Sequence, residues 1–331
     1  MEGFSRFILR SLFIVAVPVV LLVGAYVAVD PFKVLRHYDT YYHYQELDPI
    51  PNLAMVSVRN YEQQSKIHNY NAFLLGSSIA QCLPADHWIS YLPLDAEPYY
   101  LNSNQSTLTS IARRMAWLDA RGDSIKYALI VVDPAELNDH EPYDPAHIAY
   151  PEVSDVSWLK WHFTFIKGFY HRDFIASWLG TKITGQPVNI RTIKNLEPNP
   201  HGYDQRTNYM PCTFEEIQAT TSGIGHLSWP ANNEGVVRPP LLTQRYSSDL
   251  DRITDILRRH NTDYRVIIAP NAHHQSFHPV DLQLLRATFG SRLIDTTGPL
   301  DSLTHDQSLW YDPYHFRPEI GCMIIDMAYL Q

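Results

Sequence analysis

Short apolar runs that alternate with stretches of helical periodicity constrain the fold of this chain more than any other feature. The clearest run is 127–132 (YALIVV), which is apolar throughout, as a strand covered on both faces should be. The other runs are 72–75, 98–101, 264–269 and 292–295. Helical patterns follow them at 79–91, 108–121, 247–260, 279–289 and 319–330. Strands joined by helices in this way predict an α/β protein, a three-layer α/β/α sandwich around a doubly wound parallel sheet.

Residues 71–80 (NAFLLGSSIA) place two hydroxyl groups where the first strand gives way to a helix. Gly76 interrupts the apolar run, and Ser77 and Ser78 follow it. This turn lies at the carboxyl edge of the predicted sheet, where open α/β sheets bind ligands. Free N–H groups at the start of the helix could hold a developing oxyanion. The alternative is that Ser78 only caps the helix, which is the default role of a serine at this position.

A second polar group lies near the other end of the chain, in 310–318 (WYDPYHFRP). Asp312 and His315 are three residues apart and precede the last predicted helix. Asp312 could orient the imidazole of His315, which could take the proton of Ser78. An unperturbed imidazole pKa of about 6.5 suits such proton transfer near neutral pH. The alternative is a loop histidine beside an aspartate that caps the next helix.

An early Gly-Ser-Ser and a late Asp-x-x-His, at opposite ends of an α/β pattern, resemble the SGNH (GDSL-type) hydrolase superfamily. More narrowly, the chain resembles its membrane-anchored extracytoplasmic bacterial members, including those that work with cell-surface O-acylation systems. The resemblance implies a flavodoxin-like sheet and a catalytic set of Ser78, His315 and Asp312. Ser77 stands where most members have Asp. No cofactor is expected.

The oxyanion hole is where the chain departs from the pattern of that superfamily. Its members usually supply a glycine after the second strand and an asparagine after the third. Here the loop after the second strand (NSNQST) has no glycine, so Asn104 and Gln105 are the candidate donors, together with Gly76. After the third strand, Asn138 is a candidate by proximity alone. Because losing one donor can cost roughly 10²–10³ in rate, a version without catalytic activity stays open.

Four further residues are expected to contact substrate. His273 and His274 follow the fourth strand and therefore lie at the same edge of the sheet. Ser77 adjoins the nucleophile, and Arg317 could meet an anionic substrate, with a surface salt bridge as its alternative. Adjacent histidines cannot chelate a metal as an i, i+4 helical pair does, and no carboxylate cluster joins them. No metal site is expected.

Residues 11–29 (SLFIVAVPVVLLVGAYVAV) are uncharged and almost wholly apolar. At about 1.5 Å per residue, this run just spans a hydrocarbon core of about 30 Å. Arg6 and Arg10 precede it, which predicts a cytoplasmic N-terminus (residues 1–10) and an extracytoplasmic domain. A cleaved signal peptide is the alternative, but a cut after Ala28 would place Tyr26 where a small residue is preferred. An uncleaved transmembrane anchor is expected.

The rest of the chain divides by composition. Residues 30–65, rich in aromatics and proline, are expected to form a membrane-proximal connector that includes a short helix. By the resemblance, residues 66–331 are expected to form the SGNH-like catalytic domain. The rhythm of strands and helices breaks at about 138–240, which predicts an insertion that forms a cap beside the active edge, since a long structureless loop is unusual in a compact domain.

Charge and cysteine content exclude several other classes. The net charge is −9 and no Lys/Arg block stands out, which argues against a nucleic-acid partner. The three cysteines, Cys82, Cys212 and Cys322, are far apart and form no C-x-x-C pair. At most one disulfide is possible, and the spacing selects none. Free, buried thiols are the default expectation.

These features lead to one main expectation and one alternative. The main one is a membrane-anchored extracytoplasmic serine esterase or O-acyltransferase in the bacterial cytoplasmic membrane. By resemblance, it would act on acyl groups of a cell-surface polysaccharide or glycolipid, with a multi-spanning membrane acyltransferase as a candidate partner. The alternative is a catalytically inactive scaffold or carbohydrate-binding subunit of a cell-envelope modification complex.

Overall fold

A parallel sheet of five strands forms the centre of the computed structural model, in the order β2-β1-β3-β4-β5. The structure describes residues 2–42, 47, 49–134, 143–186, 188, 202–211 and 236–330. The strands are β1 (Ala72–Leu75), β2 (Pro98–Tyr100), β3 (Tyr127–Val132), β4 (Asp263–Ile268) and β5 (Leu293–Asp295). All four pairings between them are parallel. The predicted α/β class with a parallel sheet is confirmed.

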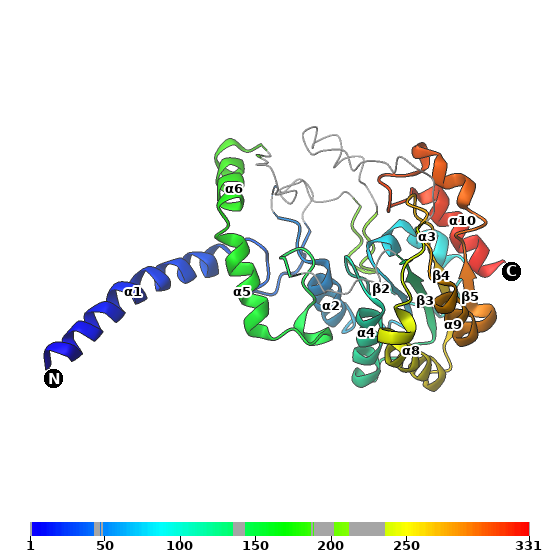
Figure 1. The fold of residues 1–331 in the computed structure, drawn as a ribbon, viewed down its shortest axis with the longest axis horizontal. Helices are drawn as coiled ribbons and strands as arrows, with labels where there is room; N and C mark the ends of the chain where they lie inside the picture. Colours follow the sequence, from blue (N-terminus) through cyan, green and yellow to red (C-terminus); the bar gives the residue numbers. More distant parts are fainter. Residues whose placement is uncertain are drawn as a thin grey trace.

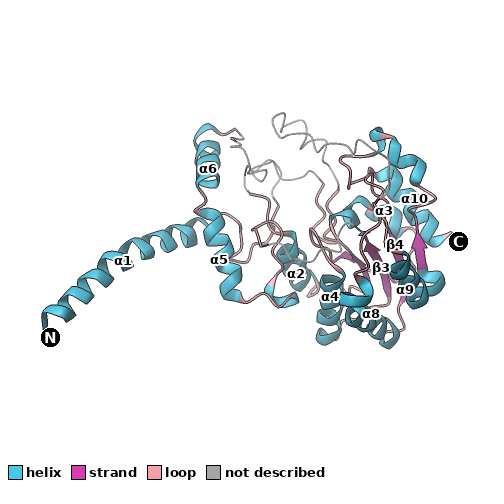
Figure 2. Ribbon diagram, in the orientation of Figure 1, coloured by secondary structure: helices cyan, strands magenta, loops and turns pink. Residues whose placement is uncertain are grey.

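Helices cover both faces of this sheet (Figures 1 and 2). Alternate residues of β1 show the division, because Phe73 belongs to one apolar cluster and Leu74 to the other. The Phe73 cluster includes residues of α2 (Leu53–Gln64), α4 (Leu108–Arg121), α8 (Ser247–Arg259) and α9 (Pro279–Phe289). The Leu74 cluster includes residues of η1 (Ser78–Cys82), α3 (Ala85–Ile89) and α10 (Pro318–Tyr329). Burial on both faces explains why the strand residues are so uniformly apolar.

The register of the strands brings their carboxyl ends to one edge. Leu75 pairs with Ile130, so β3 extends slightly beyond β1. Ile268, the last residue of β4, pairs with both Val132 and Asp295, the last residues of β3 and β5. The loops that follow these strands are therefore neighbours in space although they are far apart in the sequence.

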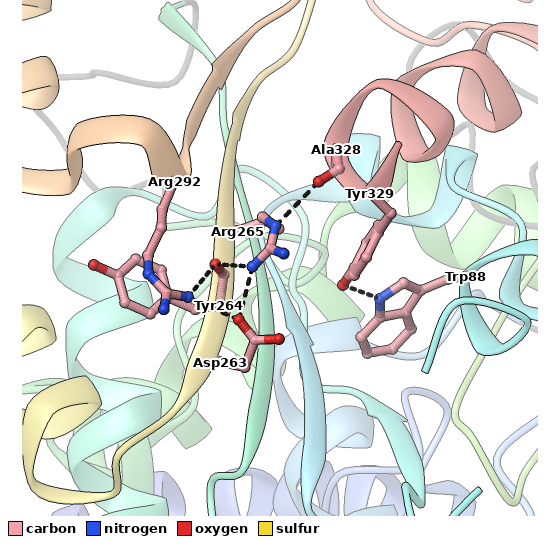
Figure 3. Close-up of polar contacts among 7 residues, drawn as sticks. All are labelled: Trp88, Asp263, Tyr264, Arg265, Arg292, Ala328 and Tyr329. Carbon is pink, nitrogen blue, oxygen red and sulfur yellow. Dashed lines mark hydrogen bonds and ion pairs between the residues drawn. The ribbon is translucent and has the colours of Figure 1, made fainter. Parts of the chain in front are cut away.

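The opposite edge of the sheet holds the end of the last helix (Figure 3). The Arg265 guanidinium donates to the Ala328 carbonyl at 3.0 Å and to the Asp263 carboxylate at 2.7 Å. The hydroxyl of Tyr329 accepts a hydrogen bond from the indole N–H of Trp88 at 3.0 Å. The C-terminal end of α10 is thus fixed near the start of β4, and its N-terminal end points toward the carboxyl edge.

Helix α1 (Glu2–Val29) extends away from the rest of the molecule (Figure 1). Its window Arg10–Val29 has 20 residues, a mean hydropathy of 2.8 and only 6% of its residues buried. The chain therefore has one N-terminal helix that is long and apolar enough to cross a membrane.

The segment expected as a connector is folded onto the body of the protein. The Asp30 carboxylate accepts the backbone N–H groups of Val34 at 2.9 Å and Leu35 at 3.2 Å, which turns the chain directly after α1. Helix α2 then packs in the Phe73 cluster, where Met55 and Val56 are fully buried. This helix supports the sheet rather than only linking it to α1.

Only part of the 138–240 segment can be compared with the predicted cap, and two of its helices lie elsewhere. Helices α5 (Trp158–Phe169) and α6 (Arg172–Thr184) sit beside the end of α1, well away from α3 and α10 (Figure 1). Residues 202–211 lie beside the end of β2, where the Thr207 carbonyl accepts the Tyr100 N–H at 2.8 Å. The expectation that this segment covers the active edge is therefore wrong for α5 and α6. The end of the segment does reach the loop after β4, where Val237 pairs with Ser276 and the Arg238 N–H donates to the Ser276 carbonyl at 2.9 Å. Residues 138–142, 187, 189–201 and 212–235 of the segment are outside the described residues.

Candidate active site

The turn after β1 presents Ser78 at the carboxyl edge of the sheet. Gly76 is required there because a Cβ at this position would lie 3.0 Å from both the Cβ and the carbonyl oxygen of Val131. The Ser77 hydroxyl accepts the Ile79 N–H at 3.2 Å and so caps η1. The capping role that the sequence left open for Ser78 is thus filled by Ser77.

His315 and Asp312 meet Ser78 at this edge. Asp312 Oδ2 lies 2.7 Å from His315 Nδ1, and His315 Nε2 lies 2.8 Å from the Ser78 hydroxyl. Because a carboxylate only accepts, Nδ1 carries a proton and Nε2 is left to accept the hydroxyl proton. The three residues form a continuous chain of hydrogen bonds, in the order that a serine nucleophile and its base require.

The Asp312 carboxylate is held by its own loop. Its Oδ1 accepts the backbone N–H groups of Tyr314 at 2.7 Å and His315 at 3.0 Å. Its side chain is 13% exposed and that of His315 16%. Burial raises the pKa of the Asp312 carboxyl, but the hydrogen bond and charge of His315 and the two N–H donors outweigh it, so the pKa is lowered overall. Asp312 is therefore an anion at neutral pH and can stabilise an imidazolium.

The loop after β4 supports the His315 loop. The Ala272 N–H donates to the Pro313 carbonyl at 2.9 Å. The rings of His273 and Tyr314 lie 4.7 Å apart. Burial lowers the pKa of His273, although Asp312 acts in the opposite direction. His273 is thus a mainly neutral imidazole at neutral pH, packed on Tyr314 in the same loop as Asp312 and His315.

His274 has different surroundings from its neighbour. Its ring nitrogens lie 3.0 Å from Asp301 Oδ1 and 3.3 Å from Thr304 Oγ1. It lines an open polar pocket at the ends of β4 and β5, with Asn271, Gln275, Ser276, Thr297 and His305 among the other lining residues. His274 is therefore held by the β5 side of the edge.

Arg317 is placed by an aromatic contact. Its guanidinium lies 4.9 Å from the centre of the Tyr311 ring, and the residue precedes the first turn of α10. A cation stacked in this way helps to fix the 310–318 loop. Its backbone N–H donates to the Leu309 carbonyl at 2.8 Å, which ties the end of this loop to its start.

Three of the four candidate oxyanion donors, Gly76, Asn104 and Gln105, lie in the described part of the chain. The Ser103 N–H donates to the Gly76 carbonyl at 3.2 Å, so the loop after β2 lies beside the Ser78 turn. In that loop Asn104 is half-buried and Gln105 is exposed, with a φ of 50°. Asn138 is outside the described residues. Ser78 is the first residue of η1, a position whose backbone N–H has no partner within its own helix.

Two neighbours of the site were not among the residues selected from the sequence. Asn102 is fully buried, and its side-chain amide donates to the Ser77 carbonyl at 3.3 Å. Tyr314 packs on His273, and burial together with the charges of Asp133 and Asp312 raises its pKa. Asn102 is the second residue after β2, so its place at the carboxyl edge was the available signal.

The remaining groups to place are the potential metal ligands and the cysteines of the described chain. Its histidines, cysteines and carboxylates form no group of three or more that could hold a metal ion. Cys82 is buried and Cys322 is half-buried, and Cys212 is outside the described residues.

Comparisons with known protein families and with curated proteins identify no relative of this chain.

Proposed function

We propose that the protein is a membrane-anchored serine esterase or O-acyltransferase. The observation that carries the proposal is the chain of hydrogen bonds from Asp312 through His315 to Ser78, with links of 2.7 and 2.8 Å. Such an arrangement lets a serine hydroxyl attack an acyl carbon without first becoming an alkoxide in water.

The reaction has two halves. Ser78 Oγ attacks the acyl carbonyl carbon while its proton moves to His315 Nε2. The tetrahedral intermediate then expels the donor's alkoxide, which takes that proton from His315, and an acyl-Ser78 ester remains. Water or a sugar hydroxyl next gives its proton to His315 and attacks the ester carbonyl carbon. The Ser78 oxygen then leaves the second tetrahedral intermediate and takes that proton back from His315, so the acyl group passes to the acceptor and Ser78 is restored. Asp312 stabilises the imidazolium in both halves.

Two features support membership of the SGNH superfamily. The strand order 2-1-3-4-5 is the flavodoxin-like order, and Ser78 follows β1 next to the point where that order reverses. The Asp-x-x-His pair directly precedes the last helix. The Ser78 N–H and the loop after β2, with Asn104 and Gln105, are the proposed oxyanion donors.

The proposed location is the bacterial cytoplasmic membrane, with the N-terminus inside and the sheet outside. Helix α1 has the length and hydropathy for one membrane crossing. Arg6 precedes its apolar window and Arg10 is the first residue of that window. The proposed substrate is an acylated cell-surface polysaccharide or glycolipid, and the proposed partner a multi-spanning acyltransferase that supplies the acyl group.

A non-catalytic scaffold or carbohydrate-binding subunit is the second candidate. The observation that favours it is the loop after β2, which contains no glycine and whose Gln105 side chain is exposed. A weak oxyanion hole would leave the hydrogen-bonded chain intact but slow acyl transfer by roughly 10²–10³.

Labelling of the full-length protein in detergent with a fluorophosphonate separates the two candidates. The enzyme hypothesis predicts covalent labelling of the wild type, none of Ser78→Ala, and normal labelling of Ser90→Ala. Ser90 is a fair control because it is an exposed serine at the end of α3, outside the site. A folded wild type that does not label would refute the enzyme hypothesis and favour the scaffold.

A further inference from the structure

Helices α5 and α6 each carry large apolar side chains that the rest of the described chain leaves uncovered. On α5, Leu159 is 83% exposed and Phe163 is 64% exposed. On α6, Ile183 is 82% exposed and Leu179, one turn earlier, 45%. The other face of α5 is buried, with Trp161, Phe165 and Phe169 in the Phe73 cluster. Large apolar groups gathered in this way mark a contact surface rather than scattered exposure.

The exposed stripe of α5 ends at the apolar helix α1. Leu159, Phe163 and Tyr170 are spaced by 4 and 7 residues, so they lie along one side of the helix. Tyr170 is at the end of that stripe, and its hydroxyl donates to the Leu22 carbonyl of α1. The buried face is held to the same helix, because the rings of Phe169 and Tyr26 lie 5.8 Å apart.

These contacts set the height of the helix pair relative to a membrane. Leu22 precedes the end of α1 at Val29 by seven residues, or about 10 Å of helix. The apolar window Arg10–Val29 is about as long as a hydrocarbon core of about 30 Å is thick. A membrane that contains this window would therefore reach the junction of α5 and α6. Figure 1 shows both helices running across the end of α1 rather than along it, as helices in the plane of a membrane do.

The charge of this region fits a membrane surface. Residues 158–184 hold four Lys or Arg and one Asp, a net charge of +3 in a chain whose net charge is −9. The four cations are Lys160, Lys167, Arg172 and Lys182. Basic residues beside an apolar helical face are typical of helices that bind anionic phospholipid headgroups.

We infer that α5 and α6 lie in the headgroup region of the membrane from which α1 emerges. Leu159, Phe163 and Ile183 reach the acyl chains, and the four cations meet anionic phospholipids. The inference rests on the part of the proposed function that places α1 in a membrane, and not on esterase activity. Two contacts, α1 and the α5–α6 pair, then fix the tilt of the sheet against the membrane.

Photo-cross-linking of the full-length protein in lipid nanodiscs tests this. The discs contain phosphatidylethanolamine and phosphatidylglycerol, and benzoylphenylalanine replaces Leu159, Phe163 or Ile183. Leu21 of α1 serves as the reference within the membrane, and Ile67, which is 75% exposed on the body, as the reference in water. We expect lipid adducts at positions 159, 163 and 183 in yields close to the yield at position 21, and no lipid adducts at position 67.

Each other outcome overturns the inference. Adducts at 21 but not at 159, 163 or 183 would leave α1 in the membrane and α5–α6 off it. Adducts that join two protein chains at those positions would assign the surface to a second copy. Absence of adducts at 21 would refute the membrane anchor itself, and the inference with it. All substituted positions are exposed, so the fold is expected to tolerate each change.

Discussion

Gly321 of α10 provides the sharpest test of how the fold holds the site. A Cβ added there would lie 2.2 Å from the Cys82 carbonyl oxygen and 2.9 Å from the Pro84 side chain. Carbon and oxygen atoms in close contact are normally about 3.3 Å apart or more, so Gly321→Ala must separate α10 from η1 by roughly 1 Å. The obstacle is backbone, which cannot rotate away as a flexible side chain would.

The displacement falls on the geometry of the candidate site. Helix η1 begins at Ser78 and ends at Cys82, whereas α10 begins three residues after His315. If half or more of the shift reaches the 2.8 Å hydrogen bond between these side chains, that bond passes the usual limit of about 3.2 Å. Misplacement by about 1 Å can cost about 10² in rate. Overpacking should also lower the free energy of unfolding by about 1–3 kcal/mol.

The assay is the rate of fluorophosphonate labelling, with thermal unfolding measured in parallel. We expect Gly321→Ala to remain folded, to melt at a lower temperature and to label about 100-fold more slowly than the wild type. Gly298→Ala is the matched control, because no atom lies within 4 Å of a Cβ at that position. A Gly321→Ala protein that labels at the wild-type rate would show that packing of α10 on η1 does not position Ser78 and His315.

Three further substitutions test separate interactions. Asp312→Asn should lower the labelling rate by about 10⁴ with the fold intact, and Asp301→Asn, which affects only His274, should change it little. Because the pKa of Asp312 is lowered from 3.8, its ionisation adds stability above about pH 4, and this stability is lost as the pH falls below that value. The difference in melting temperature between the wild type and Asp312→Asn should therefore become smaller as the pH is lowered below about 4. Asn52→Ala removes the cap of α2 and two hydrogen bonds of 3.0 Å to the carbonyls of residues 145 and 148. It should lower the free energy of unfolding, measured by chemical denaturation, by about 2–4 kcal/mol, whereas the control Thr107→Ala, which removes only the cap of α4, should lower it by about 1 kcal/mol. Equal losses in the two variants would contradict this. Burial lowers the pKa of Arg114 to about 10, and its guanidinium donates to a serine hydroxyl rather than to a carboxylate. Arg114→Met should therefore leave the free energy of unfolding unchanged or raise it by about 1 kcal/mol. A loss of more than about 2 kcal/mol in the same assay would refute that reasoning.

The strands and most helices could be predicted because their signals are local. The run at 127–132 is apolar at every position, and β3 has those bounds. The helix at 108–121 has a cap, an apolar face and a terminal glycine, and α4 has those bounds as well. Helix α2 was less visible, since its buried face includes Arg59 and Asn60, which pair with groups distant in sequence. Polar residues that find distant partners leave no periodic signal.

The site was predictable in its chemistry but not in its detail. Ser78, His315 and Asp312 were selected by residue type and by their places after a strand and before a helix. The sequence could not decide which serine caps η1, and it could not distinguish His273 from His274. Those outcomes depend on packing, because Ser77 turns to Ile79 and His274 to Asp301.

By itself, the sequence determined where strands and helices form, because hydrophobic periodicity and caps act within a few residues. It also determined which side chains capable of acid–base chemistry stand at strand ends. Only the tertiary structure decided the strand order, the place of α5 and α6 beside α1, and the meeting of Ser78 with His315, 237 residues away. Contacts of that range depend on how whole elements pack against each other, and no local pattern encodes that packing.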